Sequence, residues 1–178
     1  MTTESHHRRS IRLPKYDYSL PGAYFITICT FQRLPLFGEI ANGEMRLTPH
    51  GHAAQDCWRS LADHFSIVTL DAFVVMPNHV HGVLLLTSVG AQHAAPLPQQ
   101  PSKPHVAPHS LGAFVRGFKS AVTREVNALR QFPGVPVWQR NYYEHIIRDD
   151  DELNRIRQYI IDNPSKWNED ENNPANFP

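Results

Sequence analysis

Two histidines separated by one residue, His79 and His81, lie inside an apolar segment rich in β-branched residues that runs from Phe73 to Leu86. Alternate side chains of a strand share a face, so a strand here places both imidazoles on one side and Val80 on the other, against a core. Neutral imidazole is the commonest protein ligand for divalent metals, and two of them on one face form two arms of a metal site. A single histidine in such a strand is more often a packed core residue, so the pair is what indicates a metal site.

The composition is that of an ordinary globular protein. At 178 residues the chain is long enough for one domain with a buried core. Lys and Arg number 17 and so do Asp and Glu, so the overall charge does not indicate a polyanion-binding surface. Cys29 and Cys57 form no C-x-x-C pair, which suggests neither a disulfide framework nor a zinc finger. Because we find no N-terminal apolar segment and no run of about 20 apolar residues, we expect a cytoplasmic protein without a membrane span.

We expect a single domain over residues 1–178, with three segments of distinct composition. Residues 1–21 are polar, basic and interrupted by proline. Residues 88–109 contain five prolines, with Gln and Ala between them, and are predicted to form a flexible insertion. Residues 168–178 form a tail that carries three consecutive acids, Glu169 to Glu171.

The order of expected elements predicts the fold class. Thr48-Pro49 is typical of a helix start, Met76-Pro77-Asn78 of a tight turn, and Ser110 of a second helix start. In chain order we expect a strand at 24–31, a hairpin or loop at 36–47, a helix from 49 to about 64, strands at 67–75 and 79–86, a helix after 110, a short strand near 145–147 and a last helix after 149. This β-α-β-β-α-β order predicts an α+β fold, a ferredoxin-like antiparallel sheet with helices on one face and an appended C-terminal helix.

Tyr159 and Asn163 lie one turn apart in the last expected helix, on the flank of its apolar stripe Leu153, Ile156 and Ile160. Taken alone, this pattern is more often a boundary tyrosine and an asparagine that caps the helix C-terminus. Next to a His-x-His strand it has a second interpretation. A phenol and an amide oxygen on one helical face can meet two imidazoles on a sheet face, which would combine a nucleophile with a metal site.

The chain resembles the IS200-like single-tyrosine HUH transposases, in particular their REP-associated tyrosine transposase branch. The resemblance covers about residues 11–167 and includes two separated motifs in the same order as in the family. The matching residues are Val74-Val75-Met76-Pro77-Asn78-His79-Val80-His81, Phe118-Lys119-Ser120, Trp138, Tyr143-Glu144-His145-Ile146-Ile147-Arg148 and Tyr159-Ile160-Ile161-Asp162-Asn163-Pro164.

The resemblance implies a role for each site residue. His79 and His81 are expected as metal ligands and Tyr159 as the nucleophile. The family's third ligand is commonly a glutamine one turn after the tyrosine, where this chain has Asn163. Such a donor set suits Mg2+ or Mn2+. Attack by Tyr159 on DNA leaves a 5′-phosphotyrosine and a free 3′-OH, and the absence of a P-loop motif agrees with a reaction that needs no ATP.

Single-stranded or hairpin DNA is the partner that the resemblance implies, for a monomer or a homodimer. Basic residues suited to phosphate contacts, each of them otherwise ordinary solvated surface, are Arg8, Arg9, Arg12, Lys15, Arg116 and Lys119. Tyr142 and Tyr143 are rival nucleophiles, but their apolar, strand-like context favours packing or stacking roles.

Two other functions fit the same residues. A domesticated protein that binds DNA hairpins without transposition would carry the same motifs. A metal hydrolase that uses His79 and His81 would need further acidic ligands at strand ends, and Asp71 is the near candidate in the sequence.

Overall fold

The computed structural model describes residues 17–87, 110–132 and 134–176. Two sequence-based expectations lie outside these ranges and stay untested predictions. One is the flexible insertion at 88–109. The other is the set of N-terminal phosphate-contact candidates, Arg8, Arg9, Arg12 and Lys15.

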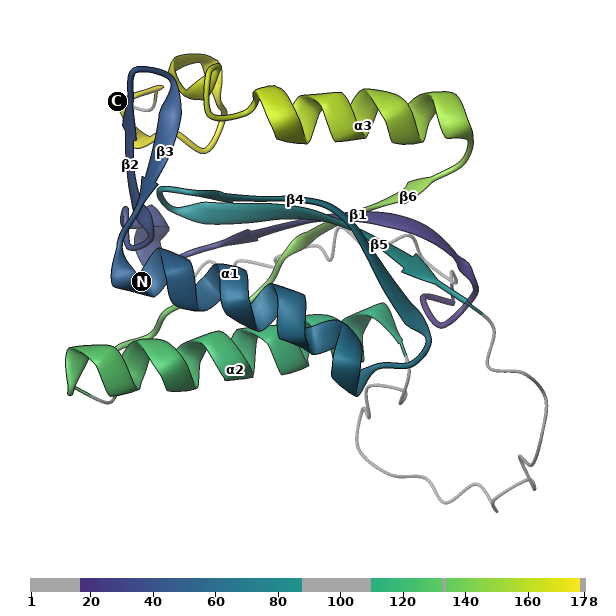
Figure 1. The fold of residues 1–178 in the computed structure, drawn as a ribbon, viewed down its shortest axis with the longest axis horizontal. Helices are drawn as coiled ribbons and strands as arrows, with labels where there is room; N and C mark the ends of the chain where they lie inside the picture. Colours follow the sequence, from purple (N-terminus) through teal and green to yellow (C-terminus); the bar gives the residue numbers. More distant parts are fainter. Residues whose placement is uncertain (1–16, 88–109, 133, 177–178) are drawn as a thin grey trace, which may run out of the picture.

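Four antiparallel strands form the central sheet, in the order β4-β5-β1-β6 (Figure 1). The strands are β1 (Gly22–Cys29), β4 (Val68–Met76), β5 (His79–Leu86) and β6 (Tyr143–Ile147). β1 and β5 lie in the centre, and their residues pair from Gly22 with Leu86 to Cys29 with His79. This is the strand order of a ferredoxin-like sheet, so the predicted α+β class is confirmed.

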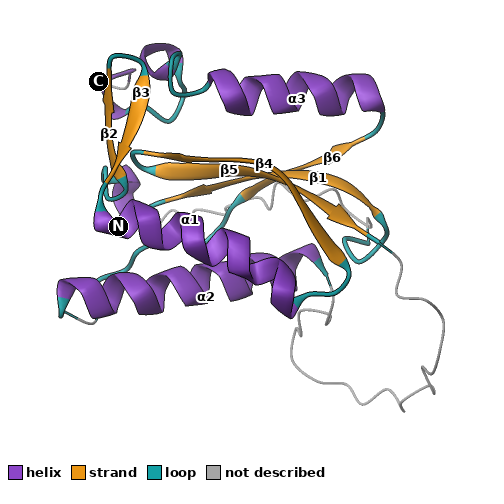
Figure 2. Cartoon of the chain, viewed as in Figure 1, coloured by secondary structure: helices purple, strands orange, loops and turns teal. Residues whose placement is uncertain are grey.

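Helices cover both faces of the sheet. α1 (Pro49–Leu61) and α2 (Leu111–Arg130) pack on one face, and the appended α3 (Asp150–Asp162) lies on the other (Figure 2). Each helix begins where a polar side chain caps it: the side chains of Thr48, Ser110 and Asp149 accept hydrogen bonds from backbone amides of the first turn. Within the described residues, no helix combines the length and the apolarity that a bilayer span requires.

The predicted hairpin at 36–47 is also present, as β2 (Gly38–Ala41) and β3 (Glu44–Leu47). One boundary differs from expectation, since β1 ends at Cys29 and not at Phe31. Cys29 pairs with His79, the first residue of β5, so the next residues have no partner on that strand. The chain turns away at Gln32 and Arg33, both with positive φ.

Side chains of β5 alternate between the two faces of the sheet. Val80 and Leu84 belong to the larger core, which the aromatic residues of α1 and α2 fill. Gly82 points to the same face, and the Trp58 indole occupies the space where a side chain would stand. Trp58 in turn stacks on Phe73 at 4.3 Å between ring centroids. The opposite face carries His79 and His81 together with a smaller apolar cluster beneath α3.

Gly82→Ala tests this packing. A Cβ on Gly82 would stand 2.4 Å from the Trp58 ring, which is itself buried and has no room to move. We expect a loss of about 1–3 kcal/mol in the free energy of unfolding, measured by urea denaturation. Gly117→Ala in α2 is the control, because its Cβ meets only ordinary contacts and a helix gains about 0.5–1 kcal/mol from the change. Equal stability of the two variants would contradict the tight contact between Gly82 and Trp58.

Candidate metal and tyrosine site

The structure places His79 and His81 on the same face of β5, with their ring nitrogens converging. The two Nε2 atoms are 3.0 Å apart, and the rings meet at an interplanar angle of 70°. Both side chains are buried, with 0% and 1% of their surface exposed. Tyr159 of α3 contacts His81, Asp170 lies near His79, and the Trp167 indole stacks on His79.

Hydrogen bonds to the other ring nitrogens orient both imidazoles. The Nδ1 atom of His79 lies 2.8 Å from Oδ1 of Asn78. The amide nitrogen of Asn78 donates to the carbonyls of Arg33 and Asn172, so its Oδ1 must accept and His79 Nδ1 must donate. His79 Nε2 therefore presents a lone pair. His81 Nδ1 lies 2.8 Å from the Thr27 hydroxyl, and donation there leaves a second lone pair beside the first.

Burial keeps both rings neutral. It lowers the pKa of His79 to about 3, and the nearby charge of Arg33 adds to the effect. Burial also lowers the pKa of His81 well below its ordinary value, with a further contribution from His79. At neutral pH neither ring is protonated in the fold, which is the state that metal ligation requires.

Asp170 is a third group at this point, and the sequence analysis did not single it out. Its Oδ2 lies 3.8 Å from His79 Nε2, and the donor atoms of His79, His81 and Asp170 are all within 4.8 Å of one another. The backbone N–H of Asn172 donates to Oδ1 of Asp170 at 2.6 Å, which fixes the orientation of the carboxylate. Its only signal in the sequence was a run of acids after the last helix, a pattern more often found on solvated surface.

Tyr159 directs its phenol into the same cluster from α3. Its oxygen lies 3.3 Å from His81 Nε2, and the two rings are 5.3 Å apart in an edge arrangement. The side chain is 42% exposed, so solvent reaches it. Burial of the remainder, with the charges of Asp170 and Glu171, raises the pKa of Tyr159 to about 12. The phenol is therefore protonated at neutral pH in the metal-free protein.

Asn163 is buried next to Tyr159, as the helical spacing predicts. Its amide nitrogen donates to Oδ2 of Asp170 at 3.0 Å. Its Oδ1 is buried and has no hydrogen-bond partner among the described residues. An unpaired buried amide oxygen is costly, so this atom is available as a ligand.

An ion pair fastens α3 to the sheet. Arg157 donates two hydrogen bonds to the carboxylate of Asp71, at 2.8 and 2.6 Å, where β4 has an irregular register. The two parallel hydrogen bonds fix the position of α3 on the sheet at Arg157, two residues before Tyr159. Asp71 is absent from the His79 cluster, so the structure does not favour the hydrolase interpretation that would use it as a ligand.

The remaining candidates lie at different distances from this cluster. The Tyr143 ring contacts Phe25, and Tyr142 lines cavities beside β6. Among the described hydrogen bonds of tyrosine phenols, only that of Tyr159 reaches a histidine. Arg116 is exposed on α2, on the other face of the sheet. The Lys119 ammonium donates to the carbonyls of Gln139 and Arg140 and so holds that segment.

The donor set fits a divalent cation. Two neighbouring ligands about 2.1 Å from an octahedral cation stand about 3 Å apart, which matches the Nε2–Nε2 separation of 3.0 Å. Two facing lone pairs without a cation would repel, whereas a shared cation satisfies both. Carboxylate and amide oxygens from Asp170 and Asn163 complete a mixed N/O set suited to Mn2+ or Mg2+.

Two known proteins are similar to this chain in sequence. No family model matches the chain. An uncharacterized protein of Haemophilus influenzae is 42% identical over 171 residues, which is 93% of each chain. A putative REP-associated tyrosine transposase of the same organism is 25% identical over 151 residues, covering 84% of this chain and 74% of its own length.

A solved structure shares the fold. It is a REP-associated tyrosine transposase bound to a REP hairpin, which matches 88% of this chain and 74% of its own with a TM-score of 0.58 and 17% identity. Fold and sequence similarity together support a relation to the REP-associated tyrosine transposases. These similarities confirm the resemblance to the REP-associated branch of the IS200-like family that the sequence motifs indicated.

Thr27→Val tests the metal site without removing a ligand. The change deletes the hydroxyl that orients His81 Nδ1 and keeps the branched shape of the side chain. Because loss of such a partner costs 10–100-fold in metal affinity, we expect Mn2+ binding to weaken by roughly that factor in isothermal titration calorimetry. Thr87→Val, which removes a hydroxyl that donates to the Ile67 carbonyl away from the candidate site, should bind as wild type. Unchanged affinity in Thr27→Val would show that the hydroxyl does not orient the ligand.

Proposed function

We propose that the protein is a metal-dependent single-stranded DNA endonuclease and transposase that uses Tyr159 as its nucleophile. The observation that carries this proposal is the approach of the Tyr159 phenol to 3.3 Å from His81 Nε2, beside His79 and Asp170. A nucleophile, a metal-ligand set and a half-exposed position occur together at one place in the fold. This is the constellation expected for phosphoryl transfer to a protein side chain.

The proposed reaction exchanges one phosphodiester bond for another. The Tyr159 oxygen forms a bond to phosphorus as the bond to the DNA 3′-oxygen breaks. The phenol releases its proton to the solvent that reaches the ring, and the leaving oxygen takes up a proton to become a 3′-OH. The product is a 5′-phosphotyrosine, which keeps the energy of the phosphodiester bond for a later strand transfer.

The residues His79, His81, Asp170 and Asn163 would hold Mg2+ or Mn2+. Such an ion, when bound, neutralises phosphate charge and lowers the cost of the phenolate. A phenol whose pKa is about 12 in the metal-free protein needs this help at neutral pH. Arg157 and Asp71 contribute by holding α3 so that the phenol stays at the cluster.

Hairpin DNA is the proposed substrate. The protein in the related structure is bound to a REP hairpin, and this chain shares its fold. Tyr159 faces the sheet from α3, so the DNA backbone has to enter the space beside the helix to reach the phenol. A single unpaired strand can do this more easily than a duplex.

Replacement of Tyr159 by phenylalanine removes one oxygen and almost no volume, so the fold should survive. Wild type incubated with a labelled single-stranded hairpin and Mn2+ should give a covalent adduct, seen as a shifted protein band on a denaturing gel. Tyr159→Phe should give no band, because no other phenol among the described residues reaches the histidines. Circular dichroism melting of both proteins controls for folding.

Tyr142→Phe and Tyr143→Phe are the matched controls and should still form the adduct. An adduct that persists in Tyr159→Phe would move the nucleophile to another residue. Hairpin binding by wild type with no adduct under any metal would support the alternative of a DNA-binding protein that does not transpose.

A further inference from the structure

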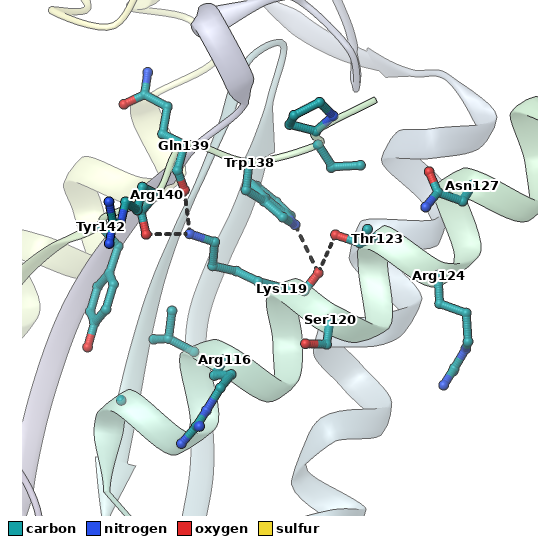
Figure 3. Close-up of a pocket in the computed structure, with 14 residues that line it drawn as sticks. Arg116, Lys119, Ser120, Thr123, Arg124, Asn127, Trp138, Gln139, Arg140 and Tyr142 are labelled. Carbon is teal, nitrogen blue, oxygen red and sulfur yellow. Dashed lines mark hydrogen bonds between the residues drawn. The ribbon is translucent and has the colours of Figure 1, made fainter. Parts of the chain in front are cut away.

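A cavity of about 740 Å3 lies between α2 and the chain segment 136–142, outside the metal and tyrosine site (Figure 3). We refer to it as the α2 cavity. Its volume is in the range of cavities that hold small organic ligands. Among the described residues that line it, every ionisable group that is charged at neutral pH is a cation, and none is a carboxylate: Arg116, Lys119, Arg124 and Arg140.

The wall of the α2 cavity is rigidly held. The Trp138 indole donates to the Lys119 carbonyl at 3.2 Å, and the Lys119 ammonium donates to the carbonyls of Gln139 and Arg140 (Figure 3). On its other side the segment is tied to the sheet, where the backbone N–H of Gln139 donates to the Cys29 carbonyl. A ligand therefore meets a surface that is already formed, which limits the entropy lost on binding.

Positive charge at the α2 cavity is available to a ligand. Arg116 and Arg140 are exposed, and neither guanidinium forms a hydrogen bond or ion pair within the described ranges. Arg124 differs, since Glu125 pairs with it at 3.1 Å. Two unengaged guanidinium groups at the rim of one cavity favour an anionic ligand, and phosphate is the anion that arginine binds in forked geometry.

Much of the lining of the α2 cavity is apolar, although Ser120, Thr123 and Asn127 also line it. Val115, Val137 and the edge of Trp138 line it, together with the half-buried ring of Tyr142. A bare phosphate would gain nothing from such a lining, whereas the flat face of a nucleobase would. Apolar walls under a cationic rim match the two halves of a nucleotide.

A second, smaller cavity lies next to the α2 cavity. It has a volume of about 240 Å3 and shares Gln139 and Tyr142 with the α2 cavity. At its other end are Asn172 and Thr27, whose hydroxyl contacts His81. The two cavities thus meet at the segment before β6, and the smaller one extends to Thr27, which lies next to the candidate metal ligand His81.

We propose that the α2 cavity binds an unpaired nucleotide of the DNA strand whose backbone passes through the smaller cavity to Tyr159. The inference rests on the proposed function and adds a binding site remote from the chemistry. The base lies against the apolar lining, and its phosphate lies between Arg116 and Arg140. A duplex does not fit this scheme, because its bases are already stacked and paired.

Fluorescence anisotropy without metal tests the proposal. The probes are a labelled oligo(dT) of about twelve nucleotides and a blunt duplex of the same length. The double variant Arg116→Ala/Arg140→Ala should bind oligo(dT) about tenfold more weakly than wild type, with a smaller change for the duplex. The control Arg59→Ala/Arg46→Ala removes two exposed arginines that do not line the α2 cavity. Its change in log Kd for oligo(dT) should be less than half the change in the Arg116→Ala/Arg140→Ala variant.

Photo-crosslinking locates the contact. Oligo(dT) with single 5-iododeoxyuridine substitutions should crosslink to the peptide that contains Trp138 and Tyr142, and the double variant should weaken the crosslink. Free thymidine monophosphate at millimolar concentration should leave the crosslink largely intact if the strand, and not a lone nucleotide, is the ligand. Equal losses in the test and control variants, competition by the free nucleotide, or crosslinks confined to other peptides would overturn the proposal.

The Tyr159 adduct assay separates the two levels of inference. Adduct formation by wild type with unchanged oligo(dT) binding in the double variant would overturn the α2 cavity as a nucleotide site and leave the proposed function standing. No adduct in wild type, with the binding difference and the crosslink present, would support the nucleotide site and overturn the nuclease.

Discussion

Strand β5 has to satisfy two opposite environments, and the rest of the structure depends on its register. One face presents Val80, Gly82 and Leu84 to the aromatic core, and the other presents His79 and His81 to α3. A slip of one residue would exchange every side chain between the faces and bury two imidazoles against Trp58. The contact between Trp58 and Gly82 thus fixes the strand that orients His79 and His81. Core packing and site geometry are consequences of the same register.

Local periodicity explains what the sequence could predict. A period of two placed both histidines on one face, and a spacing of four placed Tyr159 above Asn163 on one side of α3. The capping residues Thr48 and Ser110 marked the helix starts correctly. Strand order followed from the succession of elements, because few topologies connect such elements with short loops.

The parts that escaped prediction depend on contacts between residues remote in sequence. Asp170 follows the last helix in a segment without periodicity, and its position relies on a hydrogen bond from Asn78 to the Asn172 carbonyl and another from Arg33 to the Glu171 carbonyl. The α2 cavity likewise needs the segment before β6 to fold back on α2. In both cases the hydrogen bonds that hold the segment in place end on backbone carbonyls. Every residue type has a backbone carbonyl, so no pattern of side chains in the sequence predicts these bonds.

Helix α3 is packed much more sparsely than the helices on the other face. Ile160 is its only fully buried residue, whereas α2 buries six of its side chains and α1 buries five residues. Besides a small apolar cluster, polar contacts hold it to the sheet, among them the bidentate pair of Arg157 with Asp71 and the bond between Glu152 and His145. Segments with few buried contacts open at a lower free energy than the whole domain. Tyr159, the proposed nucleophile, is therefore carried by an element that we expect to open at a lower free energy than the whole domain. The fraction of molecules with an assembled site is then smaller than the fraction that is folded.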